Sequence, residues 1–187
     1  MKKLTIIPFV ILLCFAFGCQ GKELNAELEE FKAQAELEGQ NKELVKRIVE
    51  ELNKGNIEIF GELYAPDYGF YSPSNSPKPM SLEELIEFLK MILKAFPDAN
   101  WSIEELFAEG DRVIVRFIFA GTHEGEFQGI PATGNKVDLS SIIIFRIKNG
   151  KVIEEREDAN MLGVMMQLGM ELKPKEKKEG KLPKPIH

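Results

Sequence analysis

Four side chains of this sequence are candidates for a catalytic site: Tyr71, His123, Asp158 and Asn160. His123 is the only histidine in residues 41–170, and the usual imidazole pKa of about 6.5 suits proton transfer. A carboxylate takes a proton from carbon and returns it, whereas an amide only donates or accepts hydrogen bonds. A phenol donates a hydrogen bond to a carbonyl or enolate oxygen. These residue types are typical of acid/base chemistry on a carbonyl compound.

The first elements that must position these side chains are helices. Apolar residues at helical spacing predict helices at residues 41–52, 57–64 and 82–96, with a Pro- and Ser-rich loop at 68–79. Asn41 is a candidate N-cap for the first of them. Ser81 and Glu84 have the spacing of a capping box at the start of the third.

Strands follow the helices. The sequence changes to a period of two, in which Val113, Val115, Phe117 and Phe119 alternate with Arg or Ile at 112–118, and residues 137–148 are rich in β-branched side chains. Asn149-Gly150 predicts a two-residue hairpin turn, with a return strand at 151–158 and a short apolar closing segment at 161–170. Three helices followed by a curled antiparallel sheet indicate an α+β fold.

Two motifs carry a resemblance to a known family. The run GTHEGEFQGIPATG at residues 121–134 and the QLG tripeptide at 167–169 resemble the SnoaL-like polyketide cyclases, also called ester cyclases. The resemblance implies a cone-shaped α+β barrel, in which N-terminal helices pack in a curved antiparallel sheet. It also implies a cofactor-independent cyclase, isomerase or hydratase.

The resemblance makes Asn160 a departure from the family pattern. In these cyclases an Asp seven residues before the Gln of QLG is the general acid/base, and that position is Asn160 here. Arg156 likewise stands where many relatives have Trp. Asp158 could take over the acid/base role, although strand alternation would put it on the face of Glu154 and Arg156. Aldol cyclisation of the family's kind is therefore expected to be weak or absent. Asn160 is equally well explained as the N-cap of the closing helix.

His123 and Tyr71 also have two interpretations each. His123 belongs to the GTH signature, and it is either a catalytic imidazole or a histidine hydrogen-bonded to the returning loop. Tyr71 stands where relatives often have His, since Tyr64 and Pro73 match the family spacing. It is either a hydrogen-bond donor at the mouth of the cone or a loop aromatic packed over it.

A small-molecule pocket is expected at the open mouth of the cone. Its ligand-binding residues are expected to be large and apolar, and the alternative for each is a core position. The candidates are Trp101, Phe107, Phe117, Phe119, Met161 and Met165. The acidic cluster at residues 154–158 is not expected to bind a metal, because consecutive carboxylates on a strand point to opposite faces. No cofactor motif is recognisable, so no cofactor is expected.

The start of the sequence has the pattern of a bacterial lipoprotein signal. Lys2 and Lys3 precede an apolar run, and small residues precede Cys19, which is the expected lipidation site. The alternatives are an ordinary secretion signal or an uncleaved anchor. The lipoprotein interpretation implies a lipid-anchored, extracytoplasmic protein of the cell envelope.

Four segments are expected along the sequence. Residues 1–18 are the signal peptide, 19–40 the lipidated Cys with a charged tether, 41–170 the SnoaL-like domain and 171–187 a disordered Lys/Pro-rich tail. The net charge of -6 argues against nucleic-acid binding. The expected partners are an apolar small molecule, the membrane through the lipid, and a second copy of the chain. Three classes of function stay open: a cofactor-independent enzyme, a non-catalytic binding protein and a dimerisation module.

Overall fold

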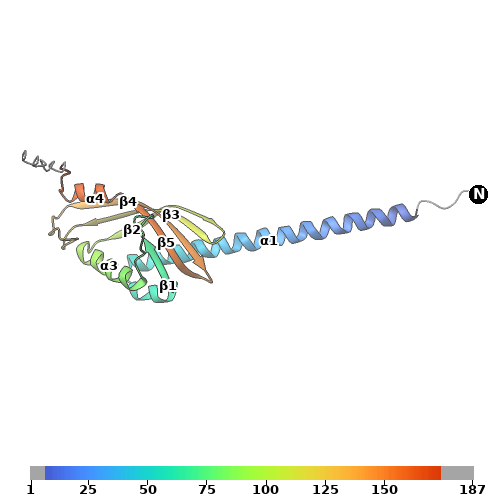
Figure 1. Ribbon diagram of the computed structural model, residues 1–187, viewed down its shortest axis with the longest axis horizontal. Helices are drawn as coiled ribbons and strands as arrows, with labels where there is room; N and C mark the ends of the chain where they lie inside the picture. The colour runs from blue at the N-terminus through green and yellow to red at the C-terminus, as the bar shows by residue number, and fades with distance from the viewer. Residues whose placement is uncertain (1–6, 174–187) are drawn as a thin grey trace, which may run out of the picture.

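A five-stranded curved sheet packed against helices forms the body of the protein (Figure 1). The computed structural model describes residues 7–173, and their side chains from residue 24 onward; residues 174–187 of the predicted tail lie outside this range. The helical elements are α1 (Ile7–Asn53), a 3₁₀ turn (Ile57–Ile59), α2 (Phe60–Leu63), α3 (Leu82–Ala95) and α4 (Met161–Gln167). The strands are β1 (Tyr64–Tyr71), β2 (Asn100–Glu109), β3 (Arg112–Thr122), β4 (Lys136–Lys148) and β5 (Lys151–Ala159).

The sheet has the order β1-β5-β4-β3-β2. Strands β2 to β5 pair antiparallel with their neighbours, and β1 pairs parallel with β5 at one edge. The helices α1 and α3 pack on the concave face, and α4 lies across one end of the sheet (Figure 1). This arrangement confirms the α+β cone that the sequence predicts.

Helix α1 is longer than predicted. It runs without a break from Ile7 to Asn53, so Asn41 is not an N-cap and residues 21–40 are helical (Figure 1). Residues of high helix propensity and ion pairs such as Lys32 with Glu29 stabilise this exposed stretch. Among the described residues, no helix is both long and apolar enough to cross a membrane.

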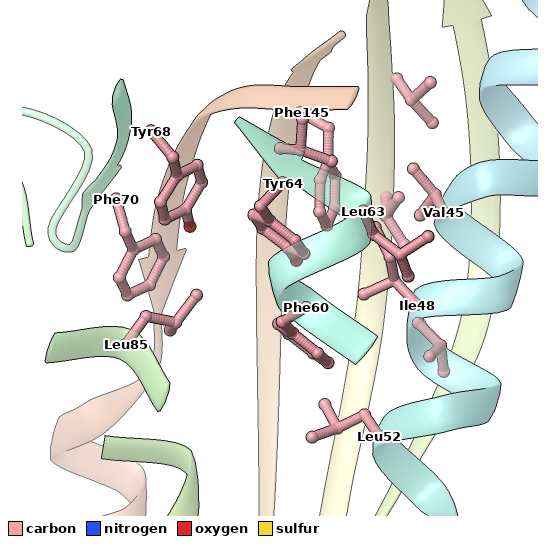
Figure 2. Packing of buried hydrophobic residues seen from close by; sticks show 14 of the residues in the cluster. Val45, Ile48, Leu52, Phe60, Leu63, Tyr64, Tyr68, Phe70, Leu85 and Phe145 are labelled. Atoms are coloured by element: carbon pink, nitrogen blue, oxygen red, sulfur yellow. The ribbon is translucent and has the colours of Figure 1, made fainter. Parts of the chain in front are cut away.

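The last turns of α1 belong to the core. Val45, Ile48 and Leu52 are buried and point toward the sheet and α2 (Figure 2). The side-chain amide of Asn41 donates to the carbonyl of Gly110, 3.1 Å away, and the Gly110 N–H donates to the Glu38 carboxylate. Helix α1 is thereby fixed to the β2–β3 turn.

The predicted loop at 68–79 is wrong in its first part, because residues 68–71 belong to strand β1. Residues 64–71 form an edge strand, although Pro66 and the Ser/Pro-rich sequence after it indicate a loop. An edge position tolerates Pro66, because only one side of the strand needs backbone hydrogen bonds. Tyr64, Tyr68 and Phe70 are buried on its inner face. The partner strand β5 lies more than 80 residues away in sequence, so the local sequence pattern does not reveal this pairing.

Other local predictions are confirmed. Ser81 and Glu84 form the capping box of α3. Asn149 and Gly150 have positive φ values of 54° and 71°, which fits the predicted hairpin turn between β4 and β5.

The loop of residues 121–134 packs against the C-terminal end of α3. The N–H groups of Glu124 and Gly125 both donate to the carbonyl of Ala95. A Cβ atom at Gly125 would lie 2.5 Å from the Lys94 carbonyl oxygen.

We therefore expect Gly125→Ala to lower the free energy of unfolding by about 1–3 kcal/mol, as overpacking does elsewhere. Gly61→Ala is the matched control, because an added Cβ meets no atom within 4 Å there. Chemical denaturation followed by circular dichroism measures both, and equal stabilities would contradict the packing of this loop.

Candidate functional site

The concave face of the sheet and the helices enclose a cavity of about 620 Å³. Its wall is mainly apolar, with side chains of α1, α3 and α4 opposite the sheet. Figure 2 shows part of this wall, where Phe60 and Tyr64 lie between Leu52 of α1 and Leu85 of α3. A volume of this size is typical of small-molecule sites.

Two carboxyl groups enter this apolar cavity from the same strand. Glu155 and Glu157 of β5 both line it, together with Ser72 and Ser141. Residues two apart on a strand point to the same face, so both carboxyls face inward. Their neighbours Glu154, Arg156 and Asp158 consequently point outward.

A β-bulge decides which acidic residues face the cavity. The register between β4 and β5 shifts after Arg146, so that Arg146 pairs with Glu154 and Ile147 with Val152. Both Val152 and Glu155 are buried, although their odd separation would put them on opposite faces of a regular strand. The extra residue in β5 thus turns Glu155 and Glu157 into the cone.

Glu155 is the most deeply buried acid, with a relative exposure of 5%. Burial raises its pKa to about 8, and the nearby hydroxyls of Tyr64 and Tyr68 offset this only in part. Its Oε1 atom and the Tyr68 hydroxyl make no hydrogen bond with another described residue. At neutral pH the carboxyl of Glu155 is therefore mostly protonated.

Glu157 has a different environment. The Ser72 hydroxyl donates to its Oε2 atom at 3.0 Å. Burial raises the pKa of Glu157, while the hydroxyls of Ser72 and Ser141 oppose the rise because they stabilise the carboxylate. The cavity therefore holds a neutral carboxyl next to one whose ionised form is hydrogen-bonded. Such a difference between two acids is characteristic of acid/base sites.

His123 lies behind the cavity wall. Its ring is fully buried, and its Nδ1 atom accepts from the backbone N–H of Thr133 and lies 3.1 Å from the Thr133 hydroxyl. The ring lies 5.2 Å from that of Phe96, which does line the cavity. His123 thus joins the end of β3 to the returning loop, the second of its two interpretations.

The other three predicted catalytic side chains also lie outside the cavity lining. Asp158 accepts from the backbone and hydroxyl of Ser74 on the outer side of β5. Asn160 caps α4, since its side-chain oxygen accepts from the N–H of Gly163 at 3.0 Å. The Tyr71 ring lies 4.1 Å below the guanidinium of Arg156. The structure does not bring these groups together at one reacting atom.

Five of the six predicted cavity residues do share the cavity wall: Trp101, Phe117, Phe119, Met161 and Met165. The prediction for Phe107 was wrong, because its side chain on β2 is 60% exposed and lies outside the cavity lining. Glu155 and Glu157 are the functional candidates that sequence reasoning missed. Strand alternation is the signal that could have found them. However, counting every second residue after the buried Val152 gives Glu154, Arg156 and Asp158, and the bulge makes this the wrong face. Within the described residues, no group of three or more His, Cys, Asp or Glu could hold a metal ion.

Known proteins match this chain over the domain. The family model for SnoaL-like polyketide cyclase matches residues 42–168. The chain is 29% identical over 132 residues to the aklanonic acid methyl ester cyclase DauD of Streptomyces sp. (strain C5), covering 68% of this chain and 80% of DauD.

Solved structures agree with this match. AclR of Streptomyces galilaeus superposes with a TM-score of 0.65 at 29% identity, over 71% of this chain and 97% of AclR. A SnoaL-like protein of Jannaschia sp. CCS1 gives a TM-score of 0.64 at 28% identity, over 73% of this chain and 96% of its own.

The raised pKa of Glu155 predicts a pH-dependent stability. The folded pKa of about 8 lies above the ordinary value of 4.5, so the folded state holds a proton that the unfolded state has lost between these values. Stability should fall as pH rises from about 5.5 to 8, by up to about 1.4 kcal/mol per pH unit. Glu155→Gln should flatten this slope and leave only the part that the raised pKa of Glu157 contributes, whereas Glu154→Gln on the outer face should keep the full slope. Urea unfolding across this pH range measures the slopes, and parallel curves for wild type and Glu155→Gln would contradict the assignment.

Proposed function

Because this chain belongs to the SnoaL-like polyketide cyclase family, we propose that it is a cofactor-independent enzyme acting on an apolar carbonyl compound by acid/base chemistry. The observation that carries this proposal is the presence of Glu157 in the apolar cavity, held by the Ser72 hydroxyl. A carboxylate whose pKa is raised toward neutrality is a stronger base, which favours it as a proton carrier.

In this proposal Glu157 takes a proton from the carbon next to the substrate carbonyl. The electron pair of the broken C–H bond moves into the carbonyl to give an enolate, and Glu157 returns the proton when the enolate reacts. Asn160 has no part in this step, because its amide does not titrate and its oxygen is engaged by Gly163. The proton carrier thus lies three residues before the family's Asp position.

Proton exchange at carbon tests this proposal without knowledge of the natural substrate. The protein should catalyse the exchange of α-protons for deuterium in D₂O on a panel of apolar ketones and methyl esters, measured by mass spectrometry. Glu157→Gln should lower the rate by about 10²–10⁴, the usual contribution of a general base. Asp158→Asn is the matched control and should retain the rate, because Asp158 contacts Ser74 outside the cavity. Exchange that survives in Glu157→Gln would exclude Glu157 as the base.

A second candidate function is non-catalytic binding of an apolar small molecule. The amide of Asn160 at the family's acid/base position favours it, since this site has lost the family's titratable group. Ligand binding without any catalysed exchange would support this alternative and reject the enzyme.

We also propose that the protein is a lipid-anchored, extracytoplasmic protein of the cell envelope. The basic start, the apolar run and Cys19 support this proposal. Helix α1 continues from this segment into the domain. Residues 20–40 would span roughly 30 Å at about 1.5 Å per residue, so the domain would stand off the membrane surface.

Lipid attachment can be measured directly. Intact mass spectrometry of the membrane fraction should show a chain that begins at Cys19 and carries acyl chains. Cys19→Ser should prevent this processing. A soluble, secreted form with unmodified Cys19 would contradict the proposal.

We further propose that two copies pair through the outer face of the sheet. Phe107, Ile114 and Ile142 are exposed there, with exposures of 60%, 42% and 50%. Phe107 and Ile114 are cross-strand neighbours on β2 and β3, and Ile114 pairs in turn with Ile144 of β4, so these three apolar side chains lie in one row across the face.

Ile142→Glu should therefore convert a dimer into a monomer, because it puts a charge into this surface. Leu162→Glu on α4 is the control, with the same exposure of 50%. Sedimentation of the full chain in density-matched detergent measures both, and a wild-type monomer would reject the pairing.

A further inference from the structure

We propose that Glu155, held in place by Tyr64 and Tyr68, forms a subsite that binds the carbonyl oxygen of an uncharged ligand by donating a hydrogen bond to it. This inference rests on the proposed function in taking the cavity as the ligand site. It adds the residues that recognise the carbonyl oxygen and the requirement that the ligand is uncharged there.

The three side chains form one rigid cluster. Tyr64 is stacked on Phe60 with ring centroids 5.0 Å apart. It also packs edge-on against Tyr68, with ring centroids 4.8 Å apart. Figure 2 shows the two tyrosines side by side, with Phe60 beneath Tyr64. Glu155 and Tyr64 line the cavity, and Tyr68 lies behind them. All three side chains are buried, so their rotamers are fixed by packing.

The cluster carries O–H donors, and no described side chain outside the cluster accepts a hydrogen bond from them. Each of its members carries one O–H group at neutral pH. The two tyrosines do so at the ordinary phenol pKa of 10.0, which burial raises further, and Glu155 does so because burial raises its pKa to about 8. The Tyr68 hydroxyl and Glu155 Oε1 have no hydrogen-bond partner among the described residues. A buried polar group without a partner costs about 1–3 kcal/mol. An acceptor atom that enters from the cavity would take the surplus hydrogen bond.

The groups around the cluster favour an uncharged acceptor at this subsite. The titratable groups that face Glu155 are Tyr64 and Tyr68 of β1 and Glu157 of its own strand. The other elements turn apolar side chains toward it: Ile48 and Leu52 of α1, Leu85 and Leu89 of α3, and Phe145 of β4. Neither Lys, Arg nor His occurs among the described residues that line the cavity. An anionic group at this subsite would therefore meet Glu157 without a compensating cation. A cationic group would be drawn to the Glu157 carboxylate, and it would offer the Glu155 O–H no acceptor.

The position of Glu157 agrees with an acceptor at this subsite. Residues two apart on a strand are separated by roughly 6.6 Å, at about 3.3 Å per residue. A carbonyl oxygen at Glu155 would thus hold the neighbouring carbon on the side of the proposed base. Charge that develops on the oxygen as this carbon loses its proton would strengthen the hydrogen bond from Glu155.

A pair of probes of similar shape tests the subsite by binding alone. The probes are 2-acetylnaphthalene, which has a carbonyl, and 2-ethylnaphthalene, which lacks it. Their affinities are measured for the full chain in lipid nanodiscs, with empty nanodiscs subtracted. The wild type should bind the ketone about 10-fold more tightly than the hydrocarbon, as expected for one hydrogen bond from a buried group. The infrared band of a ¹³C-labelled carbonyl should move to lower frequency on binding.

The variants separate hydrogen bonding from shape. Glu155→Leu should remove the preference for the ketone and the infrared shift while the hydrocarbon still binds. Tyr68→Phe should reduce both effects and keeps the core volume. In the wild type the preference should decline as pH rises through about 8, since Glu155 then ionises. Glu155→Gln keeps a donor and should make the preference independent of pH. Circular dichroism checks the fold of each variant, and Tyr68→Phe and Glu155→Gln serve where Glu155→Leu does not fold.

Two outcomes would overturn the inference. They are equal wild-type affinities for the two probes, and a preference that Glu155→Leu and Tyr68→Phe leave intact. Failure of the proposed enzyme is distinguishable from these results. A protein that shows the ketone preference but no catalysed exchange has the subsite without the activity, and the reverse combination has the activity without the subsite.

Discussion

The burial of the Glu155 carboxyl in an apolar wall is the constraint on which the rest of the site depends. An ionised carboxylate there would lack a cation, so the side chain stays protonated until its pKa of about 8. Its neutrality leaves Glu157 as the acid in the cavity whose ionised form is stabilised by hydroxyl groups. The bulge that follows Arg146 turns both acids inward, and it therefore determines the chemistry of the site as much as the identity of the residues does.

This chain shares the fold of the family but differs from it in the position of the proposed proton carrier. Asn160 stands where the resemblance implies an acid/base Asp, and here it caps α4 through Gly163. The cavity nevertheless contains titratable groups, on the strand that leads to this cap. The same cone can thus present an acid from β5 while the helix cap performs a structural role. In this arrangement His123 likewise stabilises the loop that closes the cone.

Much of the fold could be predicted from the sequence, because its signals are local. The capping box at Ser81 and the Asn149-Gly150 turn each depend on residues close together in the sequence. Strand β1 was missed because its hydrogen bonds come from β5, far along the chain. The break predicted at Asn41 was wrong because the residues before it also favour a helix. The inward acids could not be identified because one extra residue in β5 reverses the alternation on which such a prediction relies.

The most direct test of this account is the titration of individual carboxyl groups. NMR of protein labelled with ¹³C at the Glu side-chain carboxyl reports each pKa from the change of chemical shift with pH. The account predicts one Glu resonance with a midpoint near 8 that is missing from Glu155→Gln. Titration of every Glu resonance near the ordinary value of 4.5 would contradict it, because Glu155 would then be a carboxylate and no neutral donor would be present in the cavity.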